Sequence, residues 1–362
     1  MAKKKIITKK SEVFLEKYLN NPSPTGFESG GQKMWLDYIS PYIDEHFVDT
    51  YGTVVGVINP EAKYKVVIEA HADEISWFVH YITKDGYIYL RRNGGSDHQI
   101  APSKRVNIHT KKGMVKAVFG WPAIHTRTAG TEKSPKLDNI FLDCGCATKE
   151  EVEELGIHVG CVVTYEDEFM ILNDKYYVGR ALDNRIGGFM IAEVARLLKE
   201  NKVKLPFGLY ITNSVQEEVG LRGAQMIVER IRPDIAIVTD VCHDTGTPMI
   251  NKIKQGDTKC GDGPVLTYGP AVQNNLLELI ITAAEKNKIP FQRAAASRAT
   301  GTDTDAFAYA TGGVASSLIS LALRYMHTTV ETVSREDVEN VIRLIYESLQ
   351  KIKNNHDFRY LK

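Results

Sequence analysis

Residues 65–71 read KVVIEAH, a short apolar run without regular alternation of polar residues. A run of this kind is typical of a strand that is buried on both faces of a sheet. The segments PFGLYITNSV (206–215) and IAIVTD (235–240) have the same character, and segments of helical periodicity lie around them. This alternation predicts an α/β fold, in which helices cover a sheet on both faces.

Apolar residues recur at helical spacing in several parts of the chain. The segments are 13–19, 34–39, 186–198, 223–231, 274–286 and 338–349. Ser334 and Asp337 have the spacing of a capping box. The last helix is therefore expected to begin directly after Ser334.

The chain between residues 75 and 169 has a different character. It contains short β-prone pieces separated by glycines and charged residues, namely GYIYLRR, RVNIHTKKG, MVKAVFGW and CVVTYEDEF. A series of short strands predicts a small β-rich unit. Since 362 residues is the length of about two domains, we expect this unit to be inserted into the α/β sheet.

The charges of the chain balance, with 45 Lys and Arg against 45 Asp and Glu. This balance argues against a nucleic-acid binder that relies on phosphate contacts and against a basic membrane-surface protein. The sequence shows no export signal and no apolar run of membrane-spanning length. Five cysteines, an odd number, predict reduced thiols and a cytoplasmic location. Cys144, Cys146 and Cys161 lack the spacing of a zinc knuckle and are expected to be buried or idle thiols.

Histidine and acidic residues follow the predicted strands. His71 ends the first run, Glu217 and Glu218 follow the second, and Asp240 ends the third. Open α/β sheets bind their ligands outside the carboxyl ends of the strands. We therefore expect these side chains to converge at one edge of the sheet.

Each motif has an alternative when it is taken alone. His71 and Asp73 form an H-x-D motif, in which the aspartate can orient a metal-binding imidazole, but the two can also form a surface pair. Asp183, which opens a predicted helix, can bind a metal or act as the N-cap. Adjacent Glu217 and Glu218 repel one another unless cations neutralise them or the turn is exposed. Because consecutive side chains of an extended backbone point in opposite senses, one glutamate can bind metal while the other handles protons.

His327 follows the apolar run ASSLISLAL and adds a second imidazole to the set. The set then contains two histidines and three ligand carboxylates, with one carboxylate left over. This composition fits two divalent metal ions about 3.5–4 Å apart, bridged by a carboxylate and a water. Imidazole and carboxylate ligands together favour zinc, cobalt or manganese over calcium or magnesium.

At these residues the chain resembles the M42 family of metallo-aminopeptidases, which includes glutamyl and tetrahedral aminopeptidases and some proteins labelled endoglucanases. The similarity covers nearly the full length. It is carried by SPTGFE, EAHADEISWFV, GGSDHQIAPSKRVNIHTKKG, ALDNRIGG, NSVQEEVGLRGA, VTDVCHDTGTPMI, GTDTDAFAYATGGV and LRYMHTTVETV. It implies a mixed-sheet, zinc-peptidase-like catalytic domain, residues 1–74 and 170–362, and an inserted barrel-like dimerisation domain, residues 75–169. It also implies dimers that assemble into hollow tetrahedral dodecamers.

The resemblance also implies a set of metal ligands. Asp183 is expected to bridge the two metal ions. His71 and Asp240 complete one metal site, and Glu218 and His327 complete the other. The expected metals are zinc or cobalt, with manganese as a third choice.

The remaining roles concern the reaction on a peptide substrate. The resemblance implies that Glu217 is the general base, which activates a bridging water to release the N-terminal residue. Asp73 is expected to orient the first histidine ligand. The family usually reads GGTDA where this chain reads TDTDA (302–306), so Asp305 matches the family's aspartate on the substrate side and Asp303 is additional.

Two other functions remain open. A glycosidase needs two carboxylates that flank a sugar bond, about 5 Å or more apart, and adjacent Glu217 and Glu218 are poorly placed for this. A non-catalytic metal-binding scaffold is disfavoured because every expected ligand is present. His243 and Asp244 lie close to Asp240 in the sequence. We expect them to have a structural or substrate-side role rather than to form a third metal site. Acidic, basic and apolar first residues of the substrate all remain possible.

Overall fold

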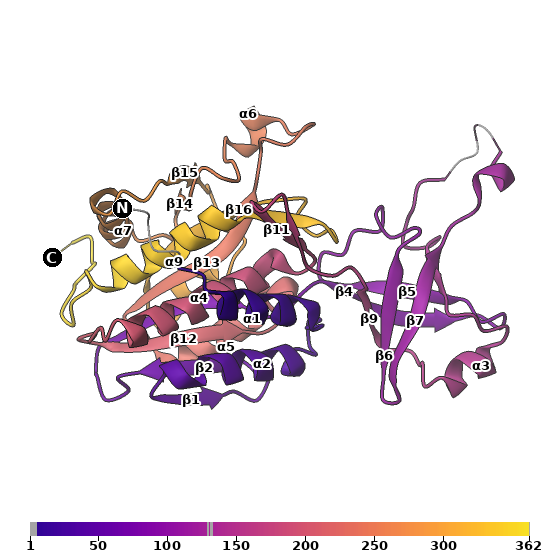
Figure 1. Cartoon of the computed structure of the whole chain (residues 1–362), viewed down its shortest axis with the longest axis horizontal. Helices are drawn as coiled ribbons and strands as arrows, with labels where there is room; N and C mark the ends of the chain where they lie inside the picture. The colour runs from indigo at the N-terminus through magenta and orange to yellow at the C-terminus, as the bar shows by residue number, and fades with distance from the viewer. Residues whose placement is uncertain (1–5, 129, 131–132, 362) are drawn as a thin grey trace.

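The computed structural model describes residues 6–128, 130 and 133–361. A larger α/β body carries a smaller β-barrel that extends from one side of it (Figure 1). The predicted fold class, a mixed sheet with helices on both faces and an inserted β-rich unit, is confirmed.

The sheet of the body has eleven strands of mixed direction. Its main path runs in the order β1-β2-β12-β3-β13-β16-β17-β11-β10, and β14 joins β16 to β15. The four central strands β12, β3, β13 and β16 are parallel to one another, and β3 and β12 are buried along nearly their whole length. The strands are β1 (Glu45–Val48), β2 (Val54–Ile58), β3 (Lys65–His71), β10 (Met170–Leu172), β11 (Tyr176–Gly179), β12 (Gly208–Ser214), β13 (Ile235–His243), β14 (Val265–Tyr268), β15 (Gln292–Ala295), β16 (Ala315–Arg324) and β17 (Glu331–Ser334).

The central strands diverge at the end that carries the predicted site. β12 and β3 stay paired up to Ser214 and His71. The pairing of β3 with β13 ends earlier, at Glu69 and Val238. Beyond these two residues the strands separate, which leaves room for side chains between their carboxyl ends.

β13 is longer than the sequence predicts. The prediction that it ends at Asp240 is wrong, because the strand continues to His243. β16 provides a partner for the additional residues, since His243 pairs with Leu323. Asp240 therefore projects from within a strand.

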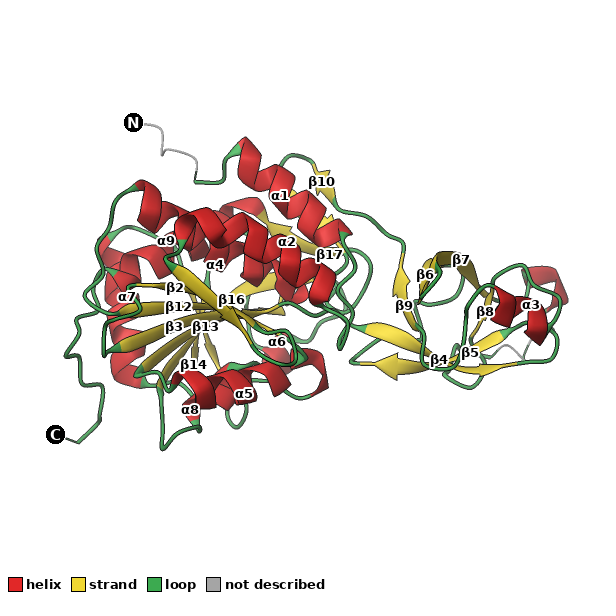
Figure 2. Ribbon diagram, turned by 90° about the horizontal axis from the view of Figure 1, so that it is seen from below, coloured by secondary structure: helices red, strands yellow, loops and turns green. Residues whose placement is uncertain are grey.

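Helices cover both faces of the sheet. α1, α2, α4 and α9 lie on one face, with α7 beside α9, and α5 and α8 lie on the other (Figure 2). All six predicted helical segments are helices, and no described helix is long and apolar enough to cross a membrane. The helices are α1 (Lys9–Asn20), α2 (Ser29–Ile39), α3 (Lys149–Glu154), α4 (Leu182–Glu200), α5 (Arg222–Ile231), α6 (Lys252–Gln255), α7 (Asn274–Lys286), α8 (Thr304–Ala308) and α9 (Arg335–Leu349), with 3-10 turns η1 (Ser40–Tyr42), η2 (Ile124–Thr126) and η3 (Glu217–Val219).

The start of α9 agrees with the predicted capping box only in part. The Ser334 hydroxyl accepts a hydrogen bond from the amide of Asp337, as expected of an N-cap. The Asp337 carboxylate does not return to the cap, because it accepts the amides of Gly261 and Gly263 instead. The acidic side chain thus fastens the loop before β14 to the first turn of α9.

The inserted unit is a closed barrel with the strand order β4-β5-β8-β7-β6-β9. The four β-prone pieces of the sequence correspond to β5, β6, β7 and β9, whereas helix α3 was not expected. The strands are β4 (Ser76–Ile82), β5 (Ile88–Asn93), β6 (Arg105–Thr110), β7 (Gly113–Gly120), β8 (Phe141–Asp143) and β9 (Val162–Tyr165). Trp77 and Phe119 pack edge to face inside it, so the barrel has a core separate from that of the sheet.

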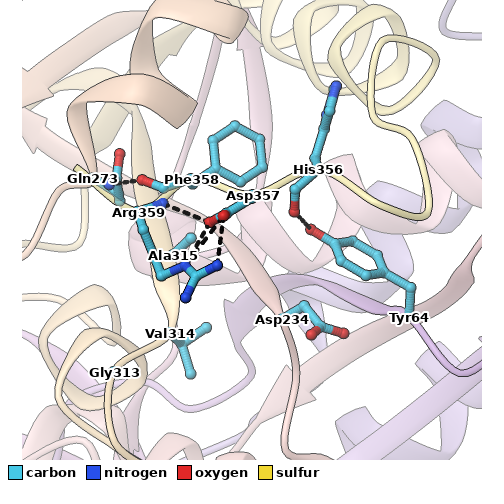
Figure 3. Close-up of a pocket in the computed structure, with 10 residues that line it drawn as sticks. All are labelled: Tyr64, Asp234, Gln273, Gly313, Val314, Ala315, His356, Asp357, Phe358 and Arg359. Carbon is cyan, nitrogen blue, oxygen red and sulfur yellow. Dashed lines mark hydrogen bonds and ion pairs between the residues drawn. The ribbon is translucent and has the colours of Figure 1, made fainter. Parts of the chain in front are cut away.

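The C-terminal segment folds back onto the amino ends of the central strands. Phe358 is only 9% exposed and joins the core of the body. The Tyr64 hydroxyl donates to the carbonyl of His356 at 2.7 Å, and the Asn275 side chain donates to the carbonyl of Phe358 at 3.1 Å. A cavity of about 360 Å³ remains between this segment and the sheet (Figure 3).

We expect Phe358→Ala to lower the free energy of unfolding by about 3 kcal/mol, because it removes a buried aromatic ring from the core. Chemical denaturation of the purified protein measures this change. Leu361→Ala is the matched control, since Leu361 is 90% exposed. Equal small effects of the two substitutions would show that the C-terminal segment does not dock as described.

Candidate metal centre

Six predicted site residues meet where the central strands diverge. β3 carries His71, β13 carries Asp240, and the start of α4 carries Asp183. The turn after β12 and the loop after β16 bring the other three residues to the same place. Together they line a cavity of about 640 Å³, and the six residues are His71, Asp183, Glu217, Glu218, Asp240 and His327.

The Asp183 carboxylate lies between the two imidazoles. Its Oδ1 is 3.3 Å from Nε2 of His71, and its Oδ2 is 3.3 Å from Nε2 of His327. Burial alone would raise the pKa of Asp183, but hydrogen bonds from His327 and His71 hold it well below its ordinary value. The alternative N-cap role is wrong, because Asn184 accepts the amide of Gly187 through its side-chain oxygen, whereas the Asp183 carboxylate faces the imidazoles.

His71 directs its two ring nitrogens to different partners. Its Nε2 faces the cavity, 3.8 Å from Glu217 and 3.9 Å from Asp240. Its Nδ1 lies 3.4 Å from Oδ1 of Asp73. Because the ring is only 2% exposed, the alternative of a surface pair is wrong. This is the arrangement expected of an imidazole that binds a metal through Nε2 while a carboxylate orients it from behind.

His327 approaches from the opposite side of the cavity. Its Nε2 lies 3.5 Å from Oε2 of Glu218, and its Nδ1 is 3.2 Å from the carbonyl oxygen of Gly95. A side chain at residue 95 would collide with the imidazole, because a Cβ atom built there lies 2.5 Å from Nδ1. The glycine therefore allows the backbone of the GGSDHQ segment to contact the histidine.

The cavity contains more carboxylates than the imidazoles of His71 and His327 can neutralise. Burial is the main cause that raises the pKa of Glu217 to about 10 and that of Asp240 to about 8, and neighbouring carboxylates raise both further. Burial also raises the pKa of Glu218 well above its ordinary value. Against the effect of burial, the neighbouring carboxylates also raise the pKa of His71 and of His327, but these two imidazoles cannot balance all of the acids, a deficit that bound cations would correct.

The donor set fits divalent metal ions. Two groups of ligand atoms, His71 with Glu217 and Asp240, and His71 with Asp183 and Glu218, each lie within 4.8 Å of one another. Ligands about 2.0–2.1 Å from one tetrahedral ion are roughly 3.3 Å apart, close to the distances around Asp183. Glu218 Oε1 is also buried without a hydrogen-bond partner among the described residues. Imidazole and carboxylate donors suit zinc, cobalt or manganese.

Asp73 holds the turn that carries both glutamates. Its Oδ1 accepts the amide of Glu217 at 3.0 Å, and its Oδ2 accepts the amide of Glu218 at 3.2 Å. The Thr25 hydroxyl donates to the same carboxylate at 2.8 Å. Asp73 thus contacts the turn as well as the ring of His71, so it can fix a ligand and the candidate base together.

The residues predicted on the substrate side have varied surroundings. Asp305 lines the cavity, and its carboxylate accepts the amides of Thr300 at 2.9 Å and Gly301 at 3.1 Å. His243 is exposed where it lines the same cavity. Asp244 is buried and binds Nε of Arg324 at 2.9 Å, which identifies a structural role.

Sequence reasoning missed Glu331, which binds the backbone of two residues of the centre. Its carboxylate accepts the amide of Asp183 at 3.0 Å and that of His327 at 2.8 Å. The side chain is 2% exposed, and burial raises its pKa well above the ordinary value. The available signal was an acidic residue in the segment VETV, close after the second histidine.

A second missed group lies beneath the cavity. The Ser214 hydroxyl contacts the carboxylates of Glu69 and Asp303, the latter at 2.8 Å. Both acids are buried, and burial raises the pKa of each. Glu69 interrupts the apolar run KVVIEAH, and this was the signal in the sequence. Asp303, the additional acid of the TDTDA segment, therefore belongs to the support of the cavity.

A family model described as M42 glutamyl aminopeptidase matches residues 52–344. The lysyl aminopeptidase of Pyrococcus furiosus is 32% identical over 342 residues, which cover 94% of this chain and 96% of that protein. The TET aminopeptidase structure from Thaumarchaeota archaeon SCGC AB-539-E09 has a TM-score of 0.90 at 30% identity, covering 96% of this chain and 98% of that one. The TET1 peptidase of Pyrococcus horikoshii has a TM-score of 0.82 at 27% identity, covering 93% and 98%.

These similarities include the cavity as well as the overall architecture. The range matched by the family model contains every residue of the candidate metal centre, from His71 to His327. The relatives align with both the sheet and the barrel, since they cover nearly the whole chain. The chain therefore belongs to the M42 family of aminopeptidases.

Proposed function

We propose that this chain is a metal-dependent aminopeptidase, which hydrolyses the N-terminal residue of peptides at a centre of two divalent metal ions. The observation that carries the proposal is the position of the Asp183 carboxylate, whose oxygens face two different imidazoles at 3.3 Å each. A carboxylate in this position can bridge two metal ions. Relatives that are named aminopeptidases support the same reaction.

The proposed ligands divide into two sets around Asp183. His71 and Asp240 hold one metal ion, and Glu218 and His327 hold the other. Zinc or cobalt is the proposed metal, with manganese as a third choice, because the donors are imidazoles and carboxylates. Glu331 would keep the backbone of Asp183 and of the second histidine in place while the ions bind.

Glu217 is the proposed general base. When bound, the two metal ions would lower the pKa of a water between them, stabilise the developing oxyanion and bind the free amino terminus. Glu217 lies beside this centre, 3.8 Å from Nε2 of His71; its carboxylate is near the donor atoms of His71 and Asp240, and we assign it to the proton rather than to the metal. Its carboxylate takes a proton from the attacking water and delivers it to the departing amine. Asp73 positions this base through the hydrogen bond to its amide.

A glycosidase is the main rival. Its two carboxylates must flank a sugar bond and act from separate positions. Glu217 and Glu218 are adjacent in one short turn, and both amides are bound by Asp73. A non-catalytic scaffold that only binds metal is the second rival. Such a scaffold would not need the carboxylate of Glu217, which is not one of the proposed ligands. The peptidase uses every one of these groups.

We also propose how the chain is organised and where it works. The catalytic domain would comprise residues 1–74 and 170–362, and the barrel, within residues 75–169, would serve dimerisation. The P. horikoshii TET1 peptidase is described as assembling into a tetrahedron or a large octahedral shell, which supports a tetrahedral dodecamer here. All five cysteines are free thiols, which is consistent with a cytoplasmic location.

Replacement of Glu217 by Gln should lower kcat by about 10²–10⁴-fold, because the amide cannot accept the proton of the water. The metal content should stay at two ions per chain, as measured by plasma mass spectrometry, since Glu217 is not a proposed ligand. Full activity in the Glu217→Gln variant would refute the assignment of the base.

Asp183→Ala should lose both activity and metal, because each ion loses a shared ligand. Equilibrium dialysis against zinc measures the loss directly. Asp262→Ala is the control, since its side chain is 53% exposed and lies outside the cavity. Retention of two ions in the Asp183 variant would contradict the bridging role.

Removal of metal by a chelator should abolish hydrolysis of aminoacyl anilides, and zinc, cobalt or manganese should restore it. The metal-free protein should also melt at a lower temperature, because bound cations stabilise the folded state that contains the crowded carboxylates. Scanning calorimetry with and without added metal checks this shift. Chelator-resistant cleavage of cellulose oligomers would favour the glycosidase instead.

A further inference from the structure

The cavity wall beyond the proposed metal ligands determines which substrate side chains fit. Leu221 and Val241 contribute apolar surface, and Met326 lies next to the second histidine. The segment from Ala299 to Thr302 forms another part of the wall with small, uncharged side chains. A substrate side chain that enters this space therefore contacts mainly apolar and hydroxyl groups.

Fixed positive charge is missing from this wall. Among the described residues that line the cavity, none is a lysine or an arginine. His243, the lining histidine outside the metal set, is exposed to solvent. The metal ions do not supply the missing charge, because two divalent cations would be balanced by the carboxylates of Asp183, Glu217, Glu218 and Asp240. An acidic side chain would lose its hydration without gaining a cationic partner.

Fixed negative charge is also limited. Apart from the four carboxylates named above, Asp305 is the acidic residue of the described lining, and both of its oxygens accept backbone amides from Thr300 and Gly301. These hydrogen bonds stabilise the turn before α8 and already satisfy part of the carboxylate. A lysine side chain would have to leave water for a single carboxylate that already shares its charge with two backbone amides.

We infer that the site prefers peptides whose first residue is uncharged and apolar, such as leucine or methionine, over those that begin with glutamate or lysine. This inference rests on the proposed aminopeptidase function and adds the class of side chain. The inferred preference differs from two names among the similar proteins. The family model is described as a glutamyl aminopeptidase, and the P. furiosus relative is named a lysyl aminopeptidase. Val241 and Leu221 are the residues that would contact the apolar side chain.

The first test compares kcat/KM of the metal-loaded protein for the p-nitroanilides of leucine, methionine, glutamate and lysine. Leucine and methionine should exceed both charged residues by about tenfold or more. A higher value for glutamate or for lysine overturns the inference. Calorimetric binding of the four free amino acids to the same protein provides a readout that does not need turnover, and it should give the same order.

A charge placed on the wall should change the preference in a predictable direction. Ala299 is exposed and lines the cavity, so a longer side chain can be added there without disturbing the core. Ala299→Arg should raise the glutamate-to-leucine ratio of kcat/KM by about tenfold, and Ala299→Glu should raise the lysine-to-leucine ratio similarly. Ala299→Gln is the uncharged control of similar length and should leave both ratios unchanged.

The outcomes separate the inference from the function on which it rests. If none of the anilides is cleaved although two metal ions are bound, the aminopeptidase function fails, and the binding order of the amino acids still tests the wall. If cleavage occurs but a charged residue is preferred, only the side-chain class is wrong. Unchanged ratios in both charged Ala299 variants would show that the substrate side chain does not meet this wall.

Discussion

The carboxylate of Asp183, shared between the imidazoles of His71 and His327, is the contact on which the site depends. It joins the end of β3, the start of α4 and the loop after β16, three segments that are distant in the sequence. Glu331 reinforces the same junction, because it accepts the amides of both Asp183 and His327. The position of the site is thus determined by hydrogen bonds within the protein.

The same junction concentrates negative charge on side chains that are mostly buried. Buried carboxylates that lack cationic partners favour protonation, and this is the state indicated by the raised pKa values of Glu217, Glu218 and Asp240. Metal binding would reverse the cost of burial, since it would replace repulsion between carboxylates by coordination, and it would couple the chemistry of the site to the stability of the fold.

Sequence reasoning predicted that the candidate residues meet at one edge of the sheet, because buried parallel strands bring their carboxyl ends together, and they line one cavity there. It selected His71, Glu217 and Asp240 because each ends or follows an apolar run. It predicted the β-rich insertion from a series of short β-prone pieces separated by glycines and charged residues. It could not place Glu331 or Glu69, because their roles depend on contacts with backbone amides and with a distant serine, which no periodicity records. The extension of β13 to His243 was missed for a related reason, as it depends on the length of its partner β16.

The cavities at the two ends of the sheet differ in how their charges are balanced. The cavity at the amino ends is bordered by Asp357 and Arg359, which form an ion pair with each other at 2.8 Å (Figure 3). The charges of the C-terminal segment that borders it therefore balance one another, and the Asp234 carboxylate in the same lining accepts the amide of Lys65. At the carboxyl ends the strands diverge, and several carboxylates and two imidazoles face one another without any lysine or arginine in the described lining. Buried acids with raised pKa values cluster at functional sites, and of these two cavities the one at the carboxyl ends has them.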